Sequence, residues 1–337
     1  MAESRFYSTL KKVGLDGFII ALMIMIFVAW LWPQGGVGEG SFSLSALAGY
    51  GVSGIFFFYG LKLDRAKLLA GLGHWRLHLV VQLSTFVLFP LLVLICHTFF
   101  YDPAYEDLWL GIFFLAALPS TVSSSVVMVS IAGGNLVAAI FNASISSLIG
   151  VFVTPLWMQL FAGASGEGLD MGDSFTKLLF QVLLPVVAGF ALSARFGWFA
   201  DKYKQFLRYF DQAVILIIVY TSFADSFLNR RFAALDAASI LILLIILVGL
   251  FFTVYFIITW VCRMLRFNKA DTIAAVFCGS KKSLVHGTVI SKVLFNDSPV
   301  MGVILLPLMI YHTAQLMLAS IIAQKAGAEL KRTKTFS

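Results

Sequence analysis

Long apolar segments, separated by short polar stretches, make up most of this chain. A helix needs about 20 apolar residues to cross the hydrocarbon core of a bilayer. Ten segments approach or meet that length: Gly17–Trp32, Leu44–Leu61, Leu77–Phe100, Leu108–Ile131, Asn135–Ala162, Phe175–Ala194, Gln212–Leu228, Ala237–Cys262, Asp271–Phe295 and Pro299–Ala323. The pattern predicts an all-α polytopic membrane protein with ten transmembrane helices.

Two of these segments, the fourth and the ninth, are interrupted by polar residues. The fourth contains LAALPSTVSSSVVMVSI from Leu115 to Ile131, and the ninth contains AAVFCGSKKSLVHGTVI from Ala274 to Ile290. A lysine at the centre of a membrane helix costs about 2.5–3.5 kcal/mol on insertion scales. It is tolerated where the helix breaks and lines a watery cavity. We therefore expect two discontinuous helices, a pattern that points to the binding site of a transporter.

The positions of the two interrupted segments indicate an internal repeat. Each precedes one long final segment, so the chain divides into two halves of five helices. An odd number of helices per half gives the halves opposite orientations, an inverted five-plus-five repeat with a site near the midplane. We expect the first repeat at 1–162, an external Gly-rich linker at 163–174, the second repeat at 175–326 and a cytoplasmic tail at 327–337.

Composition and charge place the chain in a membrane and orient it there. The chain is 60% hydrophobic and 12% charged, with a net charge of +7, whereas soluble proteins carry about 25% charged residues. If the N-terminus is cytoplasmic, 18 of the 24 Lys and Arg residues fall on the cytoplasmic side and three on the outside. This bias predicts that both termini are cytoplasmic, in a bacterial inner membrane. The basic residues then serve orientation and contact with anionic lipids, and no nucleic-acid partner is expected.

Small polar residues crowd the interruption of the fourth segment. They are Ser120, Thr121, Ser123, Ser124 and Ser125. Hydroxyls can ligate sodium, bind a solute or cap the free N–H groups of a half-helix. The alternative is that they only pack helices or bond to backbone.

Adjacent lysines mark the interruption of the ninth segment. Lys281 and Lys282 lie between Ser280 and Ser283. Neighbouring helix positions point about 100° apart, so one lysine can face the cavity while the other reaches a partner. Alternatively, the interruption is a loop near a membrane surface and both lysines are solvated.

Other polar residues lie within apolar segments, where they need hydrogen-bond partners. They are Asn142 and Ser144 in the fifth segment and Gln82 and Thr85 in the third. They either line a cavity or join helices. Because no motif for a metal, a cofactor or an oxyanion hole accompanies the Ser and Lys residues, an enzyme is the least favoured class.

The two interruptions also carry a resemblance. The runs VSSSVVMVSIAGGNLVAAIFN and FCGSKKSLVHG resemble signatures of the sodium/bile-acid symporter-like superfamily, in its divergent SBF-like branch. The resemblance implies a panel domain of helices one, two, six and seven. It also implies a core domain of helices three to five and eight to ten, in which helices four and nine cross at the solute and ion sites.

The resemblance also implies sodium sites, from which this chain departs. One site would use Ser124 and Ser125 with Asn142 or Ser144, and a second would use residues 277–281 with Gln82 or Thr85. The family's sodium-bridging Glu falls near Phe277, and a neighbouring Gln falls near Lys281. A carboxylate is lost and a positive charge gained, so we expect weak or absent sodium dependence, with a lysine ammonium in the role of a bound cation. A sodium ion remains the one possible cofactor.

These observations predict a secondary transporter of a small, anionic organic solute. Helix N-termini directed at the midplane, together with a lysine, favour an anion. The coupling ion can be sodium, a proton or none. The alternatives are a proton-coupled or uncoupled exporter and a non-transporting membrane regulator with the same fold. Solute and membrane lipids are the expected partners, and the oligomeric state stays open.

Overall fold

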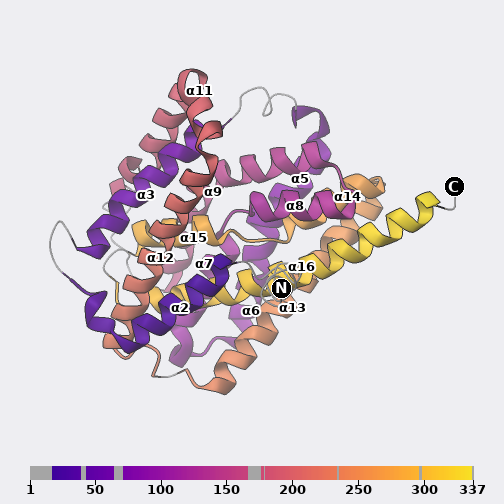
Figure 1. The fold of residues 1–337 in the computed structure, drawn as a ribbon. Coiled ribbons are helices and arrows are strands. Elements are labelled where there is room, and N and C mark those ends of the chain that lie inside the picture. Colours follow the sequence, from indigo (N-terminus) through magenta and orange to yellow (C-terminus); the bar gives the residue numbers. More distant parts are fainter. Residues whose placement is uncertain are drawn as a thin grey trace, which may run out of the picture.

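The computed structural model describes residues 17–38, 43–63, 71–165, 176–177, 179–233, 235–295 and 298–335, and every regular element in them is helical. Four helices gather on one side of the molecule (Figure 1): α2 (Gly17–Leu31), α3 (Leu44–Leu61), α11 (Leu184–Lys202) and α12 (Lys204–Leu228). We call them the four-helix group. In it α3 packs against α11, and α12 packs against α2 and α3.

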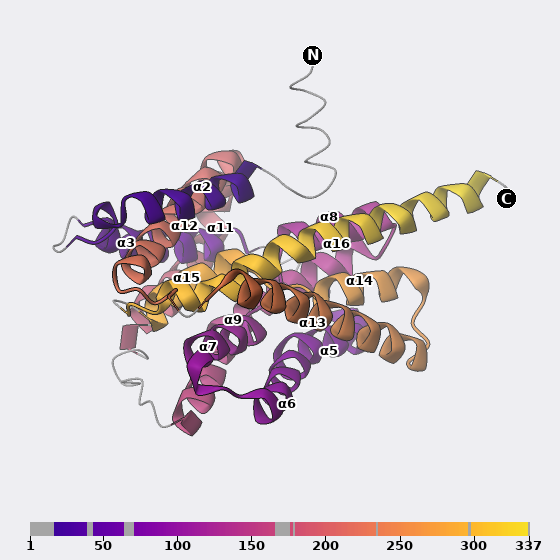
Figure 2. The same ribbon diagram turned by 90° about the horizontal axis from the view of Figure 1, so that it is seen from below.

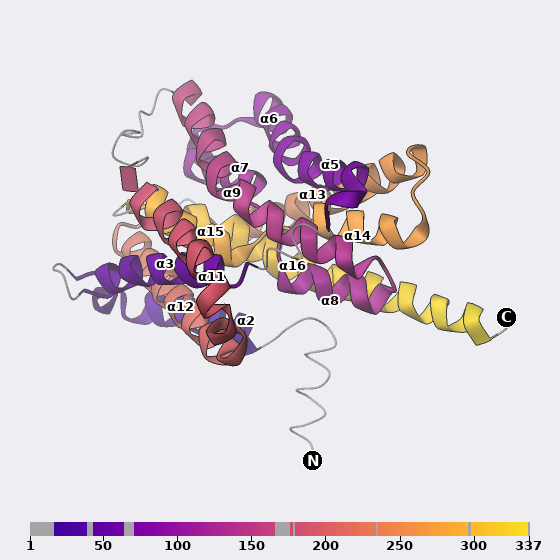
Figure 3. The same cartoon turned by 90° about the horizontal axis from the view of Figure 1, so that it is seen from above.

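The other helices surround two short helix pairs. The pairs are α7 (Glu106–Ala117) with α8 (Ser123–Ala132), and α14 (Lys269–Gly279) with α15 (Leu284–Leu294). Around them lie α5 (Trp75–Leu83), the π-helical turn η3 (Ser84–Leu88), α6 (Phe89–Phe100), α9 (Leu136–Ser165), α13 (Ala237–Met264) and α16 (Met301–Thr335). α16 runs across the molecule and ends in an arm at the C-terminus (Figure 2). α8 lies beside α14 and α16 (Figure 3).

Seven helical stretches within the described residues are long and apolar enough to cross a membrane. They are Leu44–Leu61, Trp75–Phe100, Leu136–Phe161, Leu179–Lys202, Lys204–Leu228, Ala237–Met264 and Met301–Leu330. α2 is shorter, and the fourth and ninth predicted segments are the two pairs of short helices. This architecture is that of an all-helical polytopic membrane protein.

Several predicted boundaries differ from the observed ones. The sixth predicted segment ends at 194 and the seventh begins at 212, but α11 continues to Lys202 and α12 begins at Lys204. α16 continues to Thr335, through most of the predicted tail, and α9 reaches Ser165 in the predicted linker. Hydropathy marks the apolar length of a helix, whereas the backbone hydrogen bonds continue into charged residues. Residues 1–16 and 166–174 lie outside the described part of the chain.

Candidate functional site

The first break is produced by the dipeptide Leu118-Pro119. A residue before proline is driven out of the helical region, and Leu118 is extended, with φ −71° and ψ 154°. α7 therefore ends at Ala117, which leaves its last carbonyl groups without helical N–H partners. The Thr154 hydroxyl of α9 donates to the Ala117 oxygen at 2.8 Å.

The second break spans residues 280–283, between α14 and α15. Ser283 is the N-cap of α15, where its hydroxyl oxygen accepts from the His286 N–H. α16 holds the break from the other side: the Gln315 amide accepts from the Lys282 N–H at 2.8 Å and donates to the Lys282 carbonyl at 2.7 Å. The Tyr311 hydroxyl donates to the Ser280 carbonyl at 2.7 Å.

The two breaks cross in direct contact. The Ser120 hydroxyl donates to the Cys278 carbonyl at 2.5 Å, and the Ser125 hydroxyl donates to the Phe277 carbonyl at 3.0 Å. In return, the Ser283 N–H donates to the Pro119 carbonyl at 2.9 Å. Polar residues of the first break thus satisfy carbonyl groups at the C-terminal end of α14.

Lys282 makes the matching contact in the other direction, to the C-terminal end of α7. Its side chain is fully buried. Its ammonium nitrogen donates to the carbonyl oxygens of Ala116 at 2.6 Å, Leu118 at 2.8 Å and Thr85 at 2.7 Å. The same nitrogen lies 4.2 Å from the centroid of the Phe89 ring, a cation–π distance. We call these three oxygens and this ring the Lys282 cage.

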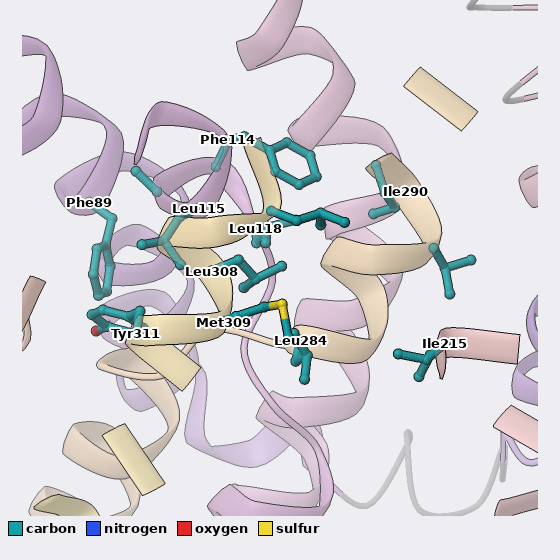
Figure 4. Packing of buried hydrophobic residues seen from close by; sticks show 14 of the residues in the cluster. Phe89, Phe114, Leu115, Leu118, Ile215, Leu284, Ile290, Leu308, Met309 and Tyr311 are labelled. Atoms are coloured by element: carbon teal, nitrogen blue, oxygen red, sulfur yellow. The ribbon is translucent and has the colours of Figure 1, made fainter. Parts of the chain in front are cut away.

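Apolar side chains surround the Lys282 cage. The Phe89 and Tyr311 rings meet edge to face, with centroids 6.2 Å apart (Figure 4). Leu115 of α7, Leu118 of the first break and Leu308 of α16 lie in one cluster, and all three are fully buried. This packing keeps the Lys282 cage out of contact with solvent.

Lys281 points to a different place. It is also fully buried, and its ammonium nitrogen lies 3.1 Å from the Ser124 hydroxyl in the first turn of α8. Ser124 and Ser125 in turn contact the Thr121 hydroxyl at 2.8 and 2.7 Å. Lys281 and these three hydroxyls, which we call the Lys281 cluster, join the second break to the N-terminal end of α8.

The Lys281 cluster contains a basic group and no acidic one. Within the described part of the chain, an ion pair joins Lys62 to Asp211, and no carboxylate lies within ion-pair distance of Lys281. The N-cap position of α8 is Val122, which offers no side-chain acceptor. A helix N-terminus carries a partial positive charge, so the ammonium and the helix end both favour an anion.

The remaining predicted site residues occupy separate positions. The Gln82 amide donates to the carbonyl and side-chain oxygens of Asn142 at 3.2 and 3.3 Å, which joins α5 to α9. The Gln82 side-chain oxygen is buried and has no partner among the described residues. Ser123 is exposed, and the Ser280 hydroxyl donates back to Val276 within α14. Ser144 accepts the Tyr59 hydroxyl at its carbonyl oxygen.

These contacts bear on the predicted sodium ligands. Among the described residues, no hydrogen bond joins Asn142 or Ser144 to Ser124 or Ser125. Thr85 takes part in the crossing through its carbonyl oxygen, which accepts from Lys282. The side chains of Lys281 and Lys282 are both fully buried at the crossing. The alternative interpretation of the second break, a surface loop with two solvated lysines, therefore does not describe this structure.

Four polar residues at the crossing were not among the predicted site residues. They are Ser146, whose hydroxyl accepts from the Ser120 N–H at 3.0 Å, and Thr154, Tyr311 and Gln315. The available signal was that each is a polar residue inside an apolar segment. Ser146 also lies one helical turn after Asn142, on the same face.

A small cavity of about 50 Å³ lies beside the crossing. Its walls come from α3, α12 and α15, so it separates the four-helix group from the second half-helix of the second break. Its polar lining residues are Tyr59, Lys62, Asp211 and His286. The His286 ring packs edge-on against Tyr59, with centroids 5.4 Å apart.

Comparison with known proteins establishes the family. Residues 16–328 match the model of the SBF-like CPA transporter family. This chain belongs to that family. It is a transporter family, as expected from the resemblance, and not a family of enzymes.

Similar proteins cover almost the whole chain. A Pseudomonas aeruginosa protein, PA2026, is 40% identical over 310 residues, which are 92% of each chain. The Escherichia coli protein named "Putative symporter YfeH" is 37% identical over 313 residues, again 92% of each chain. Sodium/bile acid cotransporter 7-A of Xenopus laevis is 33% identical over 317 residues, covering 93% of this chain and 92% of the other.

Proposed function

We propose that this protein is a secondary transporter that carries a small organic anion across the bacterial inner membrane by alternating access. The observation that carries the proposal is the Lys281 cluster, a buried ammonium beside the N-terminus of α8 with no carboxylate partner in the described residues. A buried charge without a counter-charge costs several kcal/mol. An anionic solute would lower that cost by supplying the missing charge.

The arrangement of the helices supports an inverted repeat of ten spans. The order α7, α8, α9 is two short helices followed by a long one, and α14, α15, α16 repeats that order. In this proposal the four-helix group is the panel domain and the remaining helices are the core domain. The cavity between α3, α12 and α15 then lies on their interface, where a movement of the core would open a path for the solute.

Transport of an organic anion is the first test. A thermal-shift screen of mono- and dicarboxylates, sulfonates and phosphate esters selects the solute, and proteoliposomes then measure its uptake. We expect uptake by the wild type and a loss of roughly tenfold or more in Lys281→Met, since a charge that contacts an anion contributes at least that factor. Lys325→Met, at an exposed lysine of α16, is the matched control.

The coupling ion is identified by measuring solute uptake into the same vesicles under a sodium gradient, a pH gradient or neither. No carboxylate of the described residues pairs with the lysines at the crossing, which leads us to expect uptake that needs no sodium gradient. If no solute is taken up, the alternative of a non-transporting membrane regulator is favoured. If Lys281→Met takes up the solute as fast as the wild type, the proposal that Lys281 binds the anion is wrong. Steep sodium dependence would contradict the expected coupling.

Topology is tested by cysteine labelling in whole cells. In a background without Cys96, Cys262 and Cys278, a membrane-impermeant maleimide should label Ala104→Cys and leave Lys269→Cys unlabelled until the cells are opened. Both positions are exposed in the structure. The physical reason is the excess of Lys and Arg on the proposed cytoplasmic side. The reverse labelling pattern would overturn the orientation of the whole protein.

A further inference from the structure

The surroundings of the Lys282 nitrogen consist of acceptors. Three backbone carbonyl oxygens lie at 2.6–2.8 Å, and the Phe89 ring presents its face at 4.2 Å. An ammonium group has three N–H donors, which match three acceptors, whereas a neutral amine has two donors and a lone pair. The third contact of a neutral amine would set that lone pair against a carbonyl oxygen. The geometry therefore fits the charged form.

Two different features of the backbone supply these oxygens. Ala116 and Leu118 belong to the C-terminal end of α7, where unpaired carbonyls carry the negative end of the helix dipole. Thr85 lies in η3, where the Phe89 N–H bonds five residues back to the Ser84 oxygen. In this register the Thr85 oxygen would pair with residue 90, but residue 90 is a proline and has no N–H. Pro90 thus leaves the Thr85 oxygen for Lys282.

Broken half-helix ends and unwound carbonyls are what transporters use to coordinate a small cation. We propose that the Lys282 cage is a monovalent-cation site filled by the chain's own ammonium. Lys282 is then a positioning residue, which joins the two broken helices in the way a bound cation would. If the side chain is shortened, the cage will accept a small primary alkylammonium ion.

The cage separates the roles of the two lysines. Lys282 has every N–H donor engaged by backbone, so it has none left for a solute. Lys281 contacts a hydroxyl at the end of α8 and keeps donors for an anion. This division of roles rests on the proposed function, but the cage itself rests only on the contacts of the Lys282 nitrogen.

The test is chemical rescue of a shortened side chain in the full-length, detergent-solubilised protein. Lys282→Ala removes three carbons and the nitrogen, which n-propylammonium replaces atom for atom. We expect the apparent Tm of Lys282→Ala to fall by roughly 10 °C, because three buried carbonyls lose their donors. Saturating n-propylammonium chloride should recover roughly half of that loss.

Three comparisons make the rescue specific. Tetramethylammonium chloride has the charge but no N–H donor, and 1-propanol has a donor but no charge, so neither should raise the Tm of Lys282→Ala. Wild type should not respond to n-propylammonium, because its cage is filled. Lys292→Ala removes another buried lysine, whose nitrogen contacts the Ser45 hydroxyl, and should show no rescue.

A second set of variants answers the question if Lys282→Ala yields no folded protein. Glutamine supplies two N–H donors at the end of a shorter chain and methionine supplies none. Membrane expression and apparent Tm should therefore fall in the order wild type, Lys282→Gln, Lys282→Met. Equal rescue by tetramethylammonium, or Lys282→Met as stable as Lys282→Gln, would overturn the proposal. Neither readout needs a transported solute, so a failure of the proposed function would be seen separately.

Discussion

Replacing Gln315 by methionine will destabilise the protein by about 2–6 kcal/mol. The Gln315 amide is fully buried and bonds both the N–H and the carbonyl of Lys282. Methionine has a similar length but leaves both backbone groups buried without a partner, and each such group costs about 1–3 kcal/mol. The loss falls on Lys282 in the second break, which lies between the end of α14 and the start of α15.

Thermal unfolding in detergent, followed by tryptophan fluorescence, measures this effect. At roughly 2–4 °C for each kcal/mol, the expected fall in apparent Tm is about 5–20 °C. Gln324→Met is the matched control, because Gln324 is exposed on the same helix and bonds the Ser320 hydroxyl one turn away. Equal shifts for the two variants would show that the Gln315 amide does not hold the break.

The positions of the two breaks could be predicted from sequence because their causes are local. Leu118-Pro119 ends α7 through the steric effect of proline on the preceding residue, and adjacent lysines exclude an ordinary lipid-facing helix at 281–282. The resemblance added that the breaks cross. The direct hydrogen bonds from Ser120 and Ser125 to α14 agree with that arrangement.

The contacts that hold the crossing could not be predicted, because they depend on helices far apart in sequence. A lone Gln in an apolar segment signals that it needs a partner but does not name Lys282. The Lys282 cage consists of backbone oxygens, which every residue has. Which of them is free depends on the π-helical register before Pro90 and on the final turn of α7.

The sequence also left open which lysine faces the solute. The side chains of Lys281 and Lys282 diverge, and helical spacing does not apply to them because both residues lie between the end of α14 and the start of α15. Lys282 reaches α7 and η3, and Lys281 reaches the first turn of α8. These different contacts depend on how α7, η3 and α8 pack around the break, which the sequence does not give.

Replacing Gly189 by alanine will destabilise the protein by about 3 kcal/mol, because it forces α3 and α11 apart. A Cβ atom at Gly189 would overlap the carbonyl oxygen of Phe57, and a Cβ at Gly60 would overlap that of Val186. The two helices therefore approach each other backbone to backbone at two reciprocal glycines.

Small residues permit such close packing in membranes, where van der Waals contact replaces the hydrophobic effect between helices. Inserting a methyl group into a packed contact costs about 1–3 kcal/mol. The upper value applies here because backbone atoms cannot rotate away as a side chain can.

Gly249→Ala supplies the control with the opposite sign. Gly249 lies in α13, and a Cβ built there meets nothing within 4 Å. Alanine is the better helix former by up to about 1 kcal/mol, so the apparent Tm of Gly249→Ala should stay unchanged or rise. The apparent Tm of Gly189→Ala should fall by roughly 6–12 °C. If the apparent Tm falls by a similar amount in both variants, the cause is a general sensitivity of glycines in membrane helices and not the α3–α11 contact. If Gly189→Ala alone loses stability, the close packing of α3 on α11 holds the four-helix group together as a unit, which a panel that stays fixed while the core moves requires.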